Sequence, residues 1–248
     1  MPLLGDAGHA EMLSCLRDIA ARLPRPESLL IISAHWEESV PTITSAQNPP
    51  LVYDYYNFPD EAYRIEYPCP GDPAMAAEVH RSLSTAGIDA RLDGARGLDH
   101  GVFVPLKIMY PDADIPCVEL SLVSSLDPAA HIEVGRALRS LPQQNVLVIG
   151  SGFSFHNFRD PALDSQRSQQ LNKAFEQWLM QVCCEADVSE EQRAQMLIHW
   201  RDAPGASHCH PREEHLMPLH VCYGVAEAPC DERFELSIMN KSASMYLW

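Results

Sequence analysis

The sequence lacks the features that would tie it to a membrane or to nucleic acid. No window approaches the roughly 18 uninterrupted apolar residues of a membrane span, and the opening stretch MPLLGDAGHAEM has no apolar run long enough for a signal peptide. Basic residues are few, with 18 Lys and Arg against 34 Asp and Glu and a formal net charge of −16. This charge argues against binding nucleic acid or an anionic membrane through a general electrostatic field. We therefore expect a cytoplasmic protein that binds neither nucleic acid nor a membrane.

Paired-cysteine motifs and the common nucleotide and nucleophile motifs are absent too. None of the eight cysteines forms a C-x-x-C pair, and Cys183 and Cys184 are adjacent, a spacing that normally prevents a bridge between them. We expect free thiols in a chain of this size without a signal peptide. There is no P-loop and no dinucleotide-binding glycine motif, and GSGFS at 150–154 lacks the G-x-S-x-G spacing of a serine nucleophile.

What the sequence does contain is an alternation of strand and helix patterns over a length typical of one α/β domain. Residues 28–34 are a continuous apolar run, which fits a strand buried on both faces, and 145–152 is a β-branched strand that closes in glycines. Asp72 followed by Pro73 is typical of a helix start. Further strands are predicted at 40–45, 114–122 and 232–247, and helices at 9–22, 72–86, 127–141, 163–185, 188–200 and from His210 onward. The pattern predicts a single α/β domain over residues 1–248, a layered fold with a central mixed, largely parallel sheet flanked by helices.

Two of the eleven histidines follow strands of this predicted sheet. His35 ends the strand in LIISAHWEES, and His156 lies in the loop GSGFSFHN after a second strand. His100, in GLDHGVFVPLKIMYP, lies between a glycine-bearing turn and an apolar helix. Ligands of such folds gather where the strands end at their carboxyl edge, so His35 and His156 are candidates for one site. Each also has an ordinary reading: a hydrogen-bonded strand end for His35, a neighbour of a helix cap for His100, and a backbone-bonded loop residue for His156.

The stretch SHCHPREEHLMPLH holds four histidines and a cysteine, which taken alone suggests a metal cluster. If a helix begins at Pro211, His210, His215 and His220 are five residues apart, so successive side chains point some 140° apart. They cannot all face one ion, and we expect one of them to face the site. His208 beside Cys209 is a weaker candidate for a second small site. Several imidazoles with few cysteines favour a borderline metal such as Fe(II) or Zn(II) over a cysteine-rich structural zinc.

Five stretches in order resemble the class III extradiol ring-cleaving dioxygenases, most closely their 4,5-DOPA dioxygenase-like branch. They are ISAHWEE, PPLVYDYYNFPDEAYRIEYPCPGDP, RGLDHGVFVPLKIMYPDADIPCVELSL, VLVIGSGFSFHN and HPREEHLMPLHVCYGVA. The resemblance covers nearly the whole chain, and five collinear motifs are far more specific than any single one. It implies a non-haem metal cofactor, Fe(II), whose site Zn(II) can also occupy. It further implies a catechol and O2 as substrates, and it is compatible with a homo-oligomer.

The resemblance also assigns roles to residues of this chain. His35 matches the metal ligand of the AHWE motif, and His215 matches the ligand near EHLMPL, although Glu214 is adjacent and a carboxylate fills that place in other branches. His156 matches the acid/base residue, and His100 matches a histidine that contacts the substrate or bound oxygen. The implied reaction opens the ring beside the diol and gives a semialdehyde acid.

One family ligand has no counterpart in the sequence. The resemblance places a histidine of an HG loop, and the strand before it, ahead of the segment that matches MPLLGDAGHAEM, and His9 is not its equivalent. Either the start codon lies further upstream or the chain is truly shorter. We expect the first, because loss of a central strand would leave unpaired backbone groups.

Two other functions remain open at the level of the sequence. One is a non-catalytic binding protein of the same fold, as in the Memo-like relatives, and the other is a hydrolase that uses zinc-activated water. The catechol itself is not specified, since Tyr53, Tyr55 and Tyr56 could either line a pocket or fill the core and surface.

Overall fold

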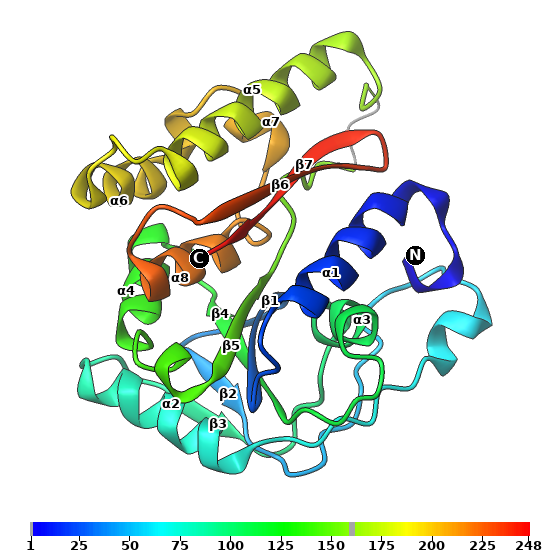
Figure 1. The fold of residues 1–248 in the computed structure, drawn as a ribbon, viewed down its shortest axis with the longest axis vertical. Coiled ribbons are helices and arrows are strands. Elements are labelled where there is room, and N and C mark those ends of the chain that lie inside the picture. Colours follow the sequence, from blue (N-terminus) through cyan, green and yellow to red (C-terminus); the bar gives the residue numbers. More distant parts are fainter. Residues whose placement is uncertain (1, 159–161) are drawn as a thin grey trace.

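The fold is built on a five-stranded sheet in the order β3-β2-β4-β1-β5, seen in a computed structural model that describes residues 2–158 and 162–248 (Figure 1). The strands are β1 (Ser28–Glu38), β2 (Thr42–Thr44), β3 (Arg91–Asp93), β4 (Cys117–Val123) and β5 (Val146–Ser151). β1 runs parallel to both β4 and β5, β2 runs parallel to β3, and only the β2–β4 pair is antiparallel. The prediction of a mixed, largely parallel sheet is therefore confirmed.

Helices cover both faces of the sheet and bury the two sides of β1 separately. On one face, Leu30 and Ile32 pack with α2 (Pro73–Thr85), α4 (Pro128–Ala137) and α8 (Met217–Ala226). On the other face, Leu29 and Ile31 pack with α1 (Ala10–Arg22) and α3 (His100–Met109). All four of these β1 side chains are fully buried, which explains the uninterrupted apolar run of this strand.

The remaining elements form a cap beside this core (Figure 1). They are α5 (Gln166–Cys184), α6 (Glu190–Ile198), the short α7 (Ala206–Cys209) and the hairpin of β6 (Glu232–Ile238) and β7 (Lys241–Leu247). Short 3-10 helices lie at Pro2–Leu4, Ala7–His9, Asp60–Arg64, Pro142–Gln144 and Trp200–Asp202. The hairpin pairs only with itself and packs between α1 and α5, so the residues 232–247 are strand as predicted but lie outside the central sheet. No helix in the described ranges is long and apolar enough to span a membrane.

The last helix begins later than predicted. α7 ends at Cys209 with His210 as its C-cap, and α8 starts only at Met217, with Pro218 in its first turn. Proline is favoured there because its missing N–H would have no partner in the helix, so Pro218 rather than Pro211 marks the start. His215 consequently lies in the turn before α8.

The eight cysteines are all free, as expected. Two of them are close neighbours, since the Sγ atoms of Cys184 and Cys230 are 2.8 Å apart. Cys184 ends α5, and Cys230 precedes β6.

The contact between α4 and α8 depends on two glycines and gives a first prediction. A Cβ atom on Gly135 would lie 2.1 Å from the Val221 carbonyl oxygen and 2.8 Å from the Gly224 Cα. Gly135→Ala should therefore force the two helices apart and lower the free energy of unfolding by about 1–3 kcal/mol, as overpacking does. Gly94→Ala is the matched control, because the nearest atom to its Cβ would be Ser45 Oγ at 3.7 Å. Equal urea midpoints for the two variants would contradict this account of the helix contact.

Candidate active site

Four histidines from different parts of the chain meet at the carboxyl edge of the sheet. His35 is near the end of β1, His100 is the first residue of α3, His156 is in the loop after β5, and His215 is in the turn before α8. The ring centroid of His35 lies 3.9 Å from that of His100 and 4.9 Å from that of His215. His156 stacks on His215 with centroids 3.3 Å apart. The structure thus brings together all four residues singled out from the sequence.

A buried hydrogen-bond chain joins the end of β1 to the start of α3. The β1–β4 pairing shifts register between Ile32 and Glu37, so His35 lies in an irregular part of the strand. Its backbone N–H donates to Ser33 Oγ at 3.2 Å, and that hydroxyl donates to Asp99 Oδ1 at 2.7 Å. Asp99 is also the N-cap of α3 and accepts from the Gly101 N–H at 2.9 Å. One carboxylate therefore fixes the backbone that carries both His35 and His100.

A second layer of polar groups lies behind Asp99. The Asp99 N–H donates to Glu119 Oε2 at 3.3 Å, and burial together with the nearby Asp99 raises the pKa of Glu119 well above its usual range. Arg96 Nη2 is 3.4 Å from Asp99 Oδ2, and its guanidinium lies 5.0 Å from the centre of the Trp36 ring. Trp36, the indole next to His35, supports this layer and does not enter the site.

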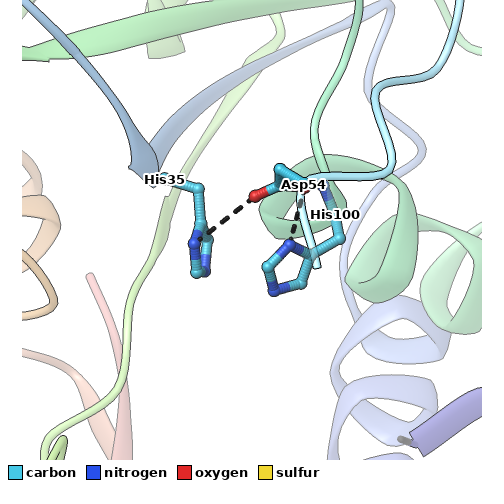
Figure 2. Close-up of side chains that lie close together, drawn as sticks. All are labelled: His35, Asp54 and His100. Atoms are coloured by element: carbon cyan, nitrogen blue, oxygen red, sulfur yellow. Dashed lines mark hydrogen bonds and ion pairs between the residues drawn. The ribbon is translucent and has the colours of Figure 1, made fainter. Parts of the chain in front are cut away.

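Asp54 contacts two of the four histidines and was not singled out from the sequence. Its Oδ1 accepts the His100 backbone N–H at 3.0 Å and lies 2.8 Å from His100 Nδ1, while Oδ2 is 3.6 Å from His35 Nδ1. Figure 2 shows the carboxylate between the two imidazoles. Burial opposes ionisation here, but the hydrogen bonds from His100 outweigh it and lower the pKa of Asp54. The only signal in the sequence was an acid among the aromatic residues of YDYYNF.

Glu214 has the matching place beside the other two histidines. Its Oε1 is 3.2 Å from His156 Nδ1 and 3.3 Å from His215 Nδ1. Burial raises the pKa of Glu214, but these contacts outweigh it and bring the pKa well below the usual range. Arg212 lies 3.4 Å from Glu214 Oε2 and forms two 2.6 Å hydrogen bonds to Glu37. Glu37, the acid two residues after His35, therefore anchors the segment that carries Glu214 and His215.

The imidazoles are electrically suited to hold a metal. The His35 side chain is 26% exposed. The surrounding protein nevertheless removes much of the water around it, and this burial, together with the neighbouring His100 and His215, lowers its pKa to about 3. Burial likewise lowers the pKa of His215. Both are neutral at pH 7, the form that offers a nitrogen lone pair to a metal. Their centroid separation of 4.9 Å and near-perpendicular rings allow both to reach one ion, and a set of imidazoles suits Fe(II) or Zn(II).

The four histidines line one end of a groove of about 1410 Å³ that runs along β5 between α1 and α8. Aromatic side chains surround this end, among them Tyr55 and Phe58 on one side and Phe158 on the other. The Tyr55 ring is 5.4 Å from His100 and its hydroxyl donates to the Ala62 carbonyl at 2.5 Å. Tyr53 is not among the lining residues, and Tyr56 is 82% exposed. Aromatic side chains therefore line the groove beside the imidazoles.

The other histidines of the SHCHPREEHLMPLH stretch have structural partners. His210 is buried with Nε2 3.0 Å from the Ser154 carbonyl, and His220 is buried between the carbonyls of Leu216 and Leu197. His208 Nε2 is 2.9 Å from Ser168 Oγ. Of these four histidines, His215 alone joins the site, although the helix from Pro211 on which the spacing argument depended is not formed, because α8 begins only at Met217. Within the part of the chain that the structure describes, no cluster with metal-binding spacing includes His208 or Cys209.

The chain matches one family model and is similar to several known proteins. The family described as the catalytic LigB subunit of aromatic ring-opening dioxygenase matches residues 8–244. The chain is 42% identical over 246 residues to the dioxygenase TasH of Hapsidospora irregularis, covering 91% of this chain and 74% of that protein. It is 38% identical over 204 residues to a 4,5-DOPA dioxygenase extradiol of Mirabilis jalapa, covering 82% and 74% of the two chains. The crystal structure of an uncharacterized protein from Escherichia coli K12 superposes with a TM-score of 0.73 at 28% identity, covering 95% of this chain and 92% of that one.

Proposed function

Because the chain belongs to the family of the catalytic LigB subunit of aromatic ring-opening dioxygenases, we propose that it is a metal-dependent extradiol dioxygenase. In this proposal it uses O2 to open a catechol ring beside the diol and gives a semialdehyde acid. The observation that carries the proposal is the meeting of four imidazoles at one end of a groove lined with aromatic side chains. Relatives named for 4,5-DOPA make a catechol with an amino-acid side chain the first substrate to test.

His35 and His215 are the residues that would hold Fe(II), with Zn(II) as an alternative occupant. When bound, the metal would lower the pKa of the catechol hydroxyls and bring the diol and O2 together. The neutral state of both imidazoles and the spacing of their rings support this assignment. Glu214 is the competing ligand, and its contacts with two imidazole nitrogens argue for a supporting place instead.

His156 is the proposed acid/base residue. Its Nδ1 faces Glu214, so Nε2 is the nitrogen left to exchange a proton with the substrate. It would accept a proton from a catechol hydroxyl on binding and return one as the ring opens. Such a transfer needs an imidazole within hydrogen-bond reach of the diol, and His156 stacks directly on the proposed ligand His215.

His100 is the proposed substrate-contacting residue on the opposite side of the cluster. Asp54 holds its Nδ1, and its ring lies against both His35 and Tyr55. From this position its Nε2 can donate a hydrogen bond to the reacting oxygens once protonated, or accept one from a catechol hydroxyl when neutral.

The test is an oxygen-uptake assay. The purified chain is first loaded with Fe(II) under anaerobic conditions and is then mixed with oxygenated buffer and substrate. With DOPA and other substituted catechols, we expect one O2 consumed per catechol, a yellow ring-fission product and no hydrogen peroxide. Chelated protein is the control and should be inactive. The same assay on a chain extended in frame upstream of Met1 tests the expectation of a further histidine ligand. No uptake by either chain across the catechol panel would overturn the proposal.

A further inference from the structure

The two carboxylates of the site repeat one pattern. Asp54 faces Nδ1 of His35 and His100, and Glu214 faces Nδ1 of His156 and His215. Each carboxylate therefore contacts one histidine proposed as a metal ligand and one proposed to act on the substrate. In every case the carboxylate meets Nδ1, which leaves the four Nε2 atoms for the interior of the site.

The same residues could instead be two three-membered metal sites, since each trio has ligand atoms within 4.8 Å of one another. Their hydrogen bonds argue against this. Asp54 Oδ1 already accepts the His100 backbone N–H and is at hydrogen-bond distance from the His100 ring, and an ionised carboxylate can only accept. Glu214 Oε1 lies between two Nδ1 atoms, and Arg212 lies beside its other oxygen. Asp54 Oδ1 and Glu214 Oε1 are therefore engaged by N–H groups. Glu214 Oε2 makes no hydrogen bond with the described residues, but the Arg212 cation 3.4 Å away opposes a metal ion there.

We propose that Asp54 and Glu214 are positioning residues that hold the histidines with the proton on Nδ1 and Nε2 directed into the site. The roles of the histidines in this inference rest on the proposed function. The position of the proton and the orientation of the rings do not depend on it. At His100, His156 and His215 the contacts of 2.8 to 3.3 Å are within or just beyond hydrogen-bond range, so the carboxylates fix the tautomer. At His35 the distance of 3.6 Å makes Asp54 an electrostatic neighbour that orients the ring.

A consequence is that each carboxylate couples metal binding to proton transfer. Histidine ligands of metals usually donate their second ring N–H to such a partner, whose loss lowers metal affinity or activity by about 10- to 100-fold. Here the same partner also serves a histidine that acts on substrate. Removing one carboxylate should therefore weaken metal affinity and kcat together, with little change in KM.

The test compares Asp54→Asn and Glu214→Gln, which keep the shape of each side chain, with Asp93→Asn as the control. Asp93 is a carboxylate that accepts the backbone N–H groups of Ala95 and Arg96 and is not among the residues that line the groove. In metal-free protein labelled with 15N-histidine, the wild type and control should show His100 and His156 protonated on Nδ1. Asp54→Asn should lose this signature at His100 and keep it at His156, and Glu214→Gln should do the reverse.

Measurements of metal affinity and of the metal's spectrum distinguish a positioning residue from a metal ligand. Zinc affinity, measured by competition with a chromophoric chelator, should fall about 10- to 100-fold in Asp54→Asn and Glu214→Gln and stay unchanged in Asp93→Asn. The visible spectrum of the Co(II)-loaded protein should keep its ligand-field bands in all three, and Asp54→Glu should recover part of the affinity. Nε2-protonated histidines in the wild type, or a changed Co(II) spectrum in either carboxylate variant, would overturn the proposal. These readouts need no turnover, so they stand apart from a failure of the oxygen assay.

Discussion

Replacing His156 with alanine should lower kcat for ring opening by about 10²- to 10⁴-fold, the range typical of a lost general acid/base residue. Metal affinity should stay within a few-fold of the wild type, because His156 stacks on His215 but is not itself a proposed ligand. The measurement is steady-state oxygen uptake together with zinc competition on the same preparations. A variant that keeps its metal but turns over slowly is the expected result.

His80→Ala is the matched control for this change. His80 is on α2 and is not among the residues that line the groove. It should leave both kcat and metal affinity unchanged. If His156→Ala retained full kcat, the acid/base assignment would be wrong, and His100 would become the first candidate.

Replacing His215 with alanine should have the largest effect on metal binding. We expect zinc affinity to fall by about 10³-fold or more, beyond the 10- to 100-fold typical of a residue that only supports a ligand. Oxygen uptake should fall to background, and excess Fe(II) should not restore it at ordinary concentrations. The measurement is metal retained after gel filtration, with the melting temperature recorded because His215 is only 9% exposed.

Glu214→Gln gives the decisive comparison for this assignment, since the two residues are adjacent and both were candidates for the ligand. If His215 is the ligand, Glu214→Gln keeps more metal than His215→Ala. The reverse order of affinities would make Glu214 the ligand and His215 its neighbour.

The layers of the fold could be predicted from the sequence because a strand that is buried on both faces must be apolar at successive positions. β1 is apolar at every position from Leu29 to Ile32, and all four side chains are buried against helices on the two faces. The start of α2 could also be predicted, because Asp72 before Pro73 is a typical helix N-cap. In the structure, Asp72 Oδ1 accepts the Met75 N–H at 2.9 Å. Local chemistry of this kind does not depend on distant parts of the chain.

Elements that depend on tertiary contacts were harder to predict. β3 has only three residues, Arg91–Asp93, and is mostly exposed, so its pairing with β2 leaves no apolar signature. The hairpin at the end of the chain turns at Met239 and Asn240, which have φ of 51° and 62°, and nothing local shows that it avoids the central sheet. The start of α8 was predicted too early because Pro211 and Pro218 carry the same local signal.

The site was predictable in its histidines and not in its carboxylates. His35 lies near the end of β1 and His156 follows β5, two parallel strands whose carboxyl ends meet at one edge of the sheet. The motifs around His100 and His215 carried the resemblance. Asp54 lies 46 residues from His100, in a segment without regular structure, and its contact arises only when that segment folds over α3. Glu214 was considered only as a rival ligand, because its position between two Nδ1 atoms is a matter of side-chain geometry.

On the proposed function, this chain inserts both atoms of O2 into a catechol ring. The most direct measurement is turnover of DOPA under 18O2 by the Fe(II)-loaded protein, with prompt borohydride reduction so that the new aldehyde oxygen does not exchange with water. We predict a ring-opened product that carries two labelled oxygen atoms, one in the new carboxylate and one at the former aldehyde carbon. Consumption of the catechol with no label in the product, or with label only in hydrogen peroxide, would contradict the account.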